Sequence, residues 1–235
     1  MTYTAENFIN WCDDMTIANE EFDGSKIKDM LDRALTVIIE TFQKLFEKFR
    51  RMMLTYQQKM NGNKYIKIPK VYHREIQEFK TKVLGFWDYD PHKLTDENIT
   101  AIKKDWADLK NDILNDKKQL MKEDKEYAEQ SGILANELYT DMKVDSRNIS
   151  GALDYAKKLR SQLSSMKSEE DVERQKDYIH KLKNEIELSK MFIDIGKFYL
   201  SFEFIDEKGV GPENPETQVV TKQEREESQI PKHSR

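Results

Sequence analysis

The sequence has few of the residues that break helices or crosslink a chain: one cysteine, eight glycines and five prolines among 235 residues. The single cysteine, Cys12, excludes a disulfide within the chain and a metal site built on cysteine pairs. The scarcity of glycine and proline, beside many Lys, Glu, Leu and Ile, favours long helices over a fold of many strands. The composition therefore predicts an all-α protein.

Long apolar runs are also missing. No stretch approaches the roughly 20 apolar residues that a membrane-spanning helix needs. Residues 1–10 have neither the basic start nor the apolar centre of a signal peptide. We therefore expect a soluble protein with no transmembrane segment, located in the cytoplasm or within an assembled particle.

The usual catalytic signatures are absent, because no GxxxxGK[ST], GxGxxG, HExxH or GxSxG pattern occurs. Asp88, Asp90 and His92 place two carboxylates and an imidazole within five residues, which a divalent metal could use. Asp and Pro are also ordinary residues of a turn before a helix, and this interpretation is preferred here. We expect no enzymatic activity, no cofactor and no bound metal.

Charge is distributed unevenly, although the net charge is only −5. Residues 1–24 carry six acids and no Lys or Arg, whereas residues 48–82 carry ten bases and two acids. Two interpretations remain open. In the first, the acidic segment folds back on the basic region or both are solvated. In the second, the basic region is a patch that binds an acidic partner.

Residues 27–60 form the longest amphipathic stretch. Apolar side chains recur there at spacings of three and four: Ile27, Leu31, Ala34, Ile38, Phe42, Leu45, Phe49, Met52, Tyr56 and Met60. This spacing predicts one helix, with Ser25 as N-cap and Asn61-Gly62-Asn63 after its end. Further apolar residues widen the stripe beyond a two-stranded seam, so more than one partner helix must cover it.

Other segments have recognisable starts and ends. Residues 64–68 alternate like a short strand, and the alternation from Phe198 to Phe204 predicts a second strand that could pair with it. Residues 145–148 have the composition of a turn, and Ser168 to Asp171 has the form of a capping box. Helices are expected at 4–19, 71–84, from 95 with an interruption near Gly132, at 149–166, and from 169 to about 200.

The predicted architecture is a bundle of long antiparallel helices with a coiled-coil-like hairpin and at most a small two-stranded ribbon. It divides into an acidic N-terminal arm, a long helix with a basic linker and aromatic loop, a helical hairpin region, and a polar extended tail. The corresponding residues are 1–24, 25–92, 93–205 and 206–235.

Two groups of residues are candidates for binding a partner. Trp and Tyr often anchor protein interfaces, which points to the aromatic residues of the arm and the loop: Phe8, Trp11, Phe86, Trp87 and Tyr89. The basic patch consists of Lys48, Arg50, Arg51, Lys59, Lys64, Lys67, Lys70 and Arg74. Aromatic residues interleave with these bases as in nucleic-acid binders, but at helix spacing they are also explained as core.

These patterns lead to two functional hypotheses. The first is a non-enzymatic structural or adaptor subunit of a larger assembly, such as a phage virion or similar particle, which contacts other protein subunits through helix faces and terminal arms. The second is a regulatory binding protein that presents the basic region at residues 48–82 to nucleic acid or to an acidic partner.

Overall fold

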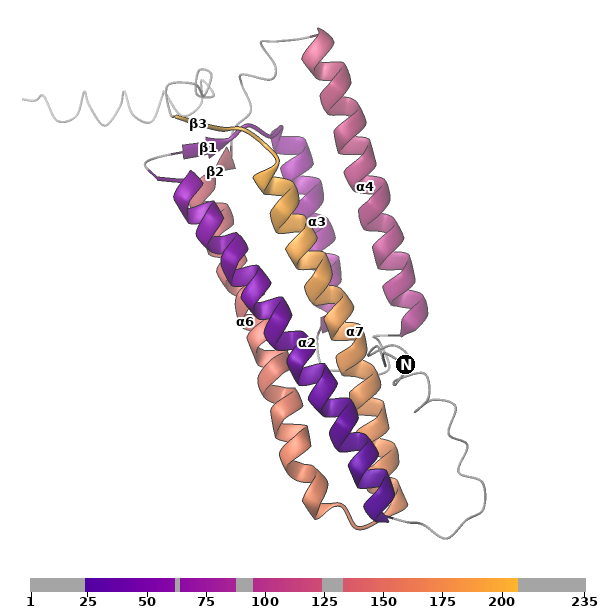
Figure 1. Cartoon of the computed structure of the whole chain (residues 1–235). Coiled ribbons are helices and arrows are strands. Elements are labelled where there is room, and N and C mark those ends of the chain that lie inside the picture. Colours follow the sequence, from indigo (N-terminus) through magenta and orange to yellow (C-terminus); the bar gives the residue numbers. More distant parts are fainter. Residues whose placement is uncertain (1–23, 62–63, 88–94, 124–132, 207–235) are drawn as a thin grey trace, which may run out of the picture.

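The computed structural model describes residues 24–61, 64–87, 95–123 and 133–206, in which five long α-helices and a small sheet make up the fold (Figure 1). The helices are α2 Gly24–Lys59, α3 Lys70–Trp87, α4 Asp96–Glu123, α6 Ala135–Gln162 and α7 Glu169–Leu200. The strands are β1 Lys64–Ile66, β2 Ile133–Leu134 and β3 Phe204–Asp206. The prediction of an all-α fold is confirmed.

Helix α2 matches the long helix predicted at residues 27–60, although Ser25 lies inside the helix and is not its cap. Its apolar stripe points inward, and Leu35, Ile38, Phe42 and Phe49 are fully buried. α2 packs mainly against α6 and α7. The stripe is wide because two neighbouring helices cover it from different sides.

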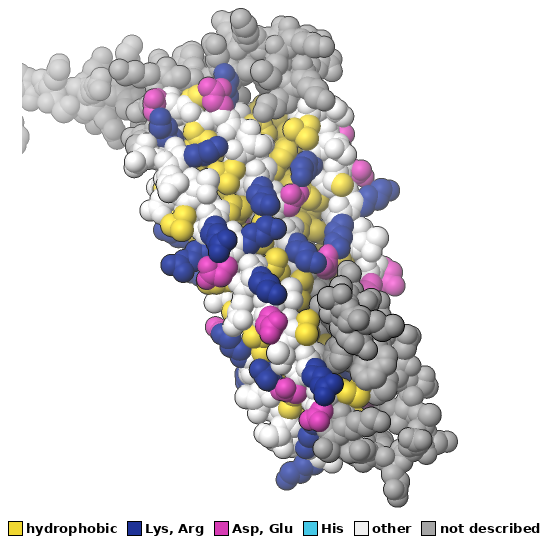
Figure 2. Space-filling view, viewed as in Figure 1, with side chains coloured by type: hydrophobic (Ala, Val, Ile, Leu, Met, Phe, Trp, Pro, Cys, Tyr) yellow, Lys and Arg dark blue, Asp and Glu magenta, His cyan; other side chains and the backbone are white. Residues whose placement is uncertain are grey.

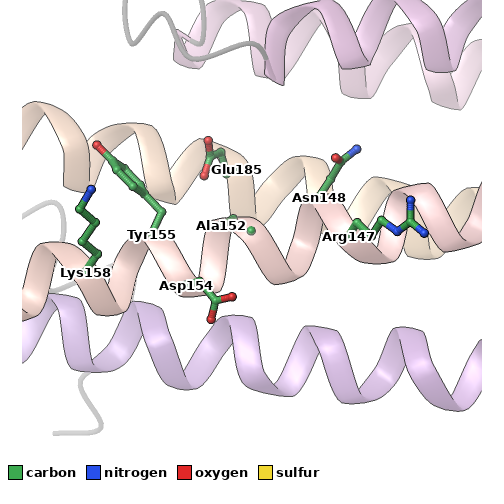
Figure 3. A pocket seen from close by; sticks show the side chains of 8 residues that line it. Arg147, Asn148, Ala152, Asp154, Tyr155, Lys158 and Glu185 are labelled. Carbon is green, nitrogen blue, oxygen red and sulfur yellow. The ribbon is translucent and has the colours of Figure 1, made fainter.

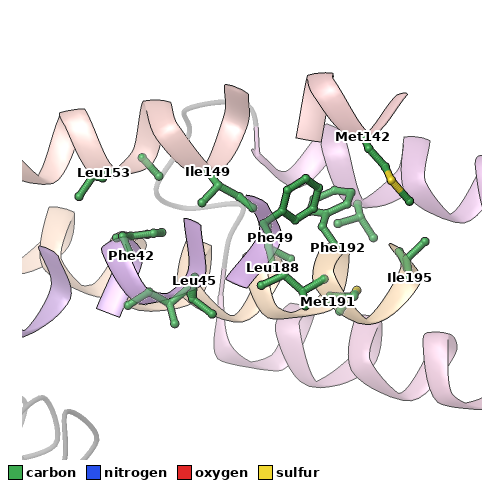
Figure 4. Packing of buried hydrophobic residues seen from close by; sticks show 14 of the residues in the cluster. Phe42, Leu45, Phe49, Met142, Ile149, Leu153, Leu188, Met191, Phe192 and Ile195 are labelled. Atoms are coloured by element: carbon green, nitrogen blue, oxygen red, sulfur yellow. The ribbon is translucent and has the colours of Figure 1, made fainter. Parts of the chain in front are cut away.

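Helix α7 runs through the middle of the bundle, with α2 and α6 on one side and α3 and α4 on the other (Figure 1). Leu188, Phe192 and Ile195 share one side of α7, whereas Ile186 and Ile193 lie on the opposite side, and all five are buried. Figure 4 shows several of these side chains among Phe42 and Phe49 of α2 and residues of α6. A helix that is apolar on every side must be central.

Close contact between α2 and α7 depends on a glycine. A Cβ atom at Gly196 would lie 2.6 Å from the Met52 Sδ atom of α2 and closer still to its methyl group. It would also lie 3.5 Å from the methyl group of Met142 on α6. A glycine inside a helix is unfavourable by about 1 kcal/mol relative to alanine, and here the missing side chain leaves room for both methionines.

The turn predicted at residues 145–148 is wrong, because α6 continues through it from Ala135 to Gln162. Asp145 is buried there and accepts a hydrogen bond from Lys80 of α3. Helix α6 is followed by a short 3₁₀ turn, Leu163–Ser165. The capping box at the start of α7 is confirmed, since the Ser168 side chain accepts from the Asp171 backbone N–H and the Asp171 carboxylate accepts in return.

The sheet has three antiparallel strands in the order β2-β1-β3, one more than the two-stranded ribbon that the sequence predicts. The expected pairing of the segment after α7 with β1 is present, in the register Lys64–Asp206, Tyr65–Ile205 and Ile66–Phe204. Phe198 to Leu200 belong to α7, so the strand begins later than the alternation indicates. β2 has two residues, too few to produce an alternating pattern.

Little apolar surface is left over in the part of the chain that the structure describes. Its large exposed apolar side chains are Leu54, 51% exposed, and Val144, 45% exposed. The wide stripe of α2, from which the sequence analysis argued for external partners, is covered by the chain's own helices. The predicted helix at 4–19 and the polar tail at 207–235 lie outside the described residues.

Candidate docking surface

The structure gives no contacts for the aromatic residues proposed as partner anchors. Phe8, Trp11 and Tyr89 lie outside the described residues. Phe86 and Trp87 are the last two residues of α3, and their side chains are likewise outside the description. The same holds for Asp88, Asp90 and His92, so docking by these aromatic residues stays a prediction.

The predicted basic patch is divided among several elements and is not one surface. Lys48, Arg50, Arg51 and Lys59 lie on α2, whereas Lys64 begins β1 and Lys67 follows it. Lys70 and Arg74 lie in the first turns of α3, which Figure 1 places behind α7 when α2 faces the viewer. Nearness in sequence therefore does not bring these cations together.

Several of these cations are neutralised within the chain. The Lys64 ammonium lies 2.6 Å from the Asp206 carboxylate across the β1–β3 pair, and Lys67 lies 3.9 Å from Glu203. Arg74 is 3.8 Å from Glu78 on the next turn of α3. The half-buried Lys64 and Lys67 therefore hold the segment that follows α7 against β1 and leave little charge for a partner.

Lys59 also makes contacts within the chain. Its ammonium donates a hydrogen bond of 3.1 Å to the Leu200 carbonyl and lies 5.3 Å from the centre of the Phe204 ring. The carbonyl belongs to the last turn of α7, where a cation is favourable because the helix dipole is negative there. Lys59 therefore connects the ends of α2 and α7.

Two further bases of residues 48–82 pair with carboxylates of α6 and α4. Lys80 donates to Asp145 over 2.8 Å, and both side chains are almost fully buried. Burial raises the pKa of the Asp145 carboxyl, although the Lys80 ammonium acts in the opposite direction. Lys82 lies 2.6 Å from Asp105 of α4 at the surface. Half of the ten bases at residues 48–82 are thus in ion pairs within the chain.

The exposed side of α2 is different. Lys48, Arg50 and Arg51 are exposed and form no ion pair with any residue that the structure describes. Lys44, which is not among the residues of the predicted basic patch, is also exposed and forms no ion pair with a described residue. Positions 44, 48 and 51 are four and three residues apart and share one side of the helix, while Arg50 faces another direction. We call Lys44, Lys48 and Arg51 the basic strip.

Neighbouring elements add positive charge beside the strip. Lys190 and Lys197 of α7 are exposed and seven residues apart, so they share a side of that helix. Figure 2 shows that Lys and Arg predominate over Asp and Glu in the middle of the face that α2 and α7 present. Lys190 is compensated by Glu187 on its own helix. Lys197, like the strip, forms no ion pair with a described residue. The strip is therefore one part of a broader basic face.

The strip borders a shallow hollow of about 600 Å³ on the exposed side of α2. Its lining includes Glu40, Gln43, Lys44, Glu47, Lys48 and Arg51. The two glutamates fix where a partner's negative charges can lie, because like charges placed close together repel. A partner's carboxylates or phosphates would therefore approach Lys44, Lys48 and Arg51 from the side away from Glu40 and Glu47.

Neither a metal centre nor a membrane span is found in the described parts of the chain. No group of three or more His, Cys, Asp or Glu side chains among them could hold a metal ion. None of their helices is long and apolar enough to cross a membrane. Comparison with protein-family models, with curated proteins and with solved structures finds no match.

Proposed function

We propose that the chain is a non-enzymatic adaptor or structural subunit of a larger assembly, which docks an acidic protein partner through the basic strip Lys44, Lys48 and Arg51. One contrast supports this proposal. These three exposed cations form no ion pair with a described residue, whereas Lys64, Lys80 and Lys82 of the same region are paired within the chain. A row of uncompensated cations attracts a surface of opposite charge.

The helix beneath the strip suits a docking role. α2 has 36 residues, which corresponds to a length of about 54 Å at 1.5 Å per residue. Its buried side holds it against α6 and α7, so the three cations keep a fixed spacing over about 10 Å. Because the apolar stripe is already covered, charge and not apolar burial would select the partner. Such an interface forms quickly and weakens with salt.

The kind of assembly is also part of the proposal. Long charged helices with few glycines and prolines suit a component of a virion or a similar particle. In such a particle this chain would act as a rigid spacer between other protein subunits, with the basic strip as one of its contacts.

Nucleic acid is the second candidate for the strip, since phosphates bind the same cations. Binders of single strands usually add aromatic side chains on which bases stack. Of the aromatic residues interleaved with the basic region, Phe49, Tyr56, Tyr72 and Phe79 are buried in the bundle. Tyr65, the fifth of these aromatic residues, is half-buried. The burial of the other four leaves little stacking surface, which supports an acidic protein over nucleic acid as the partner.

The test is a triple charge reversal, Lys44→Glu, Lys48→Glu and Arg51→Glu, in the full chain. Binding of a poly-glutamate peptide and of a single-stranded oligonucleotide is measured at low and at physiological salt. We expect peptide binding to weaken by about tenfold or more in the variant, since each close charge pair at an interface can contribute about 1.5 kcal/mol or more.

A matched control reverses three exposed lysines elsewhere, Lys104→Glu, Lys143→Glu and Lys157→Glu, and makes the same change in net charge. Equal loss in both variants would contradict the proposal, because it would reduce the effect to overall charge. Strip-dependent binding of the oligonucleotide alone would favour the second candidate. A strictly monomeric chain that binds neither probe would overturn both.

A further inference from the structure

A second site lies between α6 and α7, on residues that do not belong to the basic strip. A cavity of about 360 Å³ is lined there by residues of α6 from Arg147 to Lys158 and by Glu185 of α7 (Figure 3). In Figure 3, Asn148 and Tyr155 project to the side of α6 where Glu185 lies, while Asp154 points the other way. The volume falls within the usual range for small-molecule sites.

Glu185 is the unusual member of this lining. It is only 3% exposed, and its Oε2 atom is buried without a hydrogen-bond partner. Its other oxygen, Oε1, lies 3.8 Å from the Lys181 ammonium, which is too far for a hydrogen bond. An unpaired buried acceptor is unfavourable by about 1–3 kcal/mol, so a group kept in this state beside a cavity suggests that a ligand completes it.

The protonation of Glu185 fits this interpretation. Burial raises the pKa of its carboxyl to about 7, and the Lys181 ammonium offsets only part of that effect. Near neutral pH the group is therefore partly a neutral acid, which can both donate and accept a hydrogen bond. A carboxyl in this state can pair with a ligand edge that presents an N–H group beside a nitrogen acceptor.

The wall of the cavity is aromatic. The Tyr155 ring is half-buried and packs edge-on against Tyr178, with 5.8 Å between ring centres. The Lys181 ammonium lies 5.9 Å from the centre of the same ring. Burial raises the pKa of the Tyr155 hydroxyl to about 12, so it stays neutral. A flat ligand can therefore contact this ring without meeting a negatively charged tyrosine oxygen.

The two ends of the cavity are cationic, and its middle is open. Arg147 and Lys158 are exposed and eleven residues apart, which is about 16 Å along α6. Gly151 lies between them, and a Cβ atom placed there would meet nothing within 4 Å. A ligand that reaches Glu185 can therefore place a negative group near a cation at one end.

We propose that this cavity binds a small heteroaromatic amine that carries an anionic group, the chemistry of an amino-purine nucleotide. The amino N–H donates to the Glu185 carboxyl after a rotation of that side chain turns an oxygen toward the cavity, the ring packs beside Tyr155, and the phosphate or carboxylate pairs with Arg147 or Lys158. The site is separate from the basic strip on α2 and does not depend on the function proposed for it.

The experiment compares three probes by calorimetry on the full chain: adenosine monophosphate, inosine monophosphate and adenosine. Inosine monophosphate lacks the amino group, and adenosine lacks the phosphate. We expect adenosine monophosphate to bind and each of the others to bind about tenfold more weakly or less, because one lost charged or buried hydrogen bond is worth about 1.5 kcal/mol. Equal binding of the three, or none at about 1 mM, would overturn the proposal.

Substitutions then locate the binding. Gly151→Leu fills the open middle of the cavity, and Gly85→Leu is its matched control, an exposed helical glycine in α3 that also has nothing within 4 Å. Gly151→Leu should abolish binding of adenosine monophosphate, while Gly85→Leu should leave it unchanged. Unfolding curves show that both variants fold. Unimpaired binding to the Gly151→Leu variant would place the ligand elsewhere and refute the site.

Discussion

The bundle buries two lysine–carboxylate pairs, and they differ in how fully the carboxylate is satisfied. Lys80 of α3 donates to Asp145 of α6 over 2.8 Å, and its ammonium also lies 5.7 Å from the centre of the Phe192 ring of α7. Lys181 and Glu185 lie on one helix, α7, and are 3.8 Å apart. The first pair connects three helices, whereas the second leaves a carboxylate oxygen without a partner.

The difference arises because the first pair joins residues of two helices, whereas both residues of the second pair lie on one helix. Lys80 and Asp145 approach from separate helices, so each side chain can adopt the geometry of a direct hydrogen bond. Lys181 and Glu185 are four residues apart with the lysine first, which is the less favourable order for a pair on one helix. Two buried lysine–carboxylate pairs can thus have different consequences: one holds α3 against α6, and the other leaves an unpaired carboxylate oxygen on a residue that lines a cavity.

The largest expected effect on stability comes from breaking the hydrogen-bonded pair Lys80 and Asp145. Lys80→Ala leaves the Asp145 carboxylate buried without its cation, which should lower the free energy of unfolding by about 3–5 kcal/mol. The double variant Lys80→Met, Asp145→Leu removes both charges and should recover most of that loss. Urea unfolding followed by circular dichroism measures both. A Lys80→Ala variant as stable as the parent would show that the pair does not hold α3 against α6.

The second pair, Lys181 and Glu185, should make the stability of the protein depend on pH through the Glu185 carboxyl. The folded chain keeps the Glu185 proton up to about pH 7, while an unfolded glutamate releases it near 4.5. Between these values the folded state binds more protons, so stability falls as pH rises and levels off above the folded pKa. A shift of this size corresponds to on the order of 3 kcal/mol.

Glu185→Leu removes the contribution of the Glu185 proton to the pH dependence of stability. The variant should therefore gain stability relative to the parent at pH 8 and lose this advantage toward pH 4.5. Asp145, whose pKa is also raised, is present in both proteins, so the difference between their pH profiles isolates Glu185. Parallel profiles would contradict the raised pKa and weaken the contrast between the two pairs.

The smallest effect is expected at an exposed pair, Lys82 and Asp105. Their atoms lie 2.6 Å apart, closer than those of Lys80 and Asp145, but both side chains are about half exposed. Lys82→Ala should change the free energy of unfolding by at most about 1 kcal/mol, since solvent and salt screen the interaction. A loss as large as that of Lys80→Ala would show that distance, and not burial, separates strong pairs from weak ones.

The charged residues show which contacts can be predicted from the sequence and which cannot. Helix spacing alone places positions 44, 48 and 51 on one side of α2, so the basic strip could have been found from the sequence. That Lys64 meets Asp206 and that Lys80 meets Asp145 could not, because each pair is separated by many residues and joined only by packing. The predicted turn at 145–148 failed for the same reason, since a buried partner outweighs the local preference of Asp, Ser and Asn.

What the sequence by itself determined is local: the long helix of α2, the capping box at Ser168 and the all-α class. These follow from side-chain spacing and from hydrogen bonds between neighbouring residues, which the chain carries wherever it folds. Only the tertiary structure decided which neighbours cover the wide stripe, which cations are neutralised, and that Glu185 is buried beside a cavity. Burial and long-range pairing are properties of the packed bundle, since they require several helices to meet.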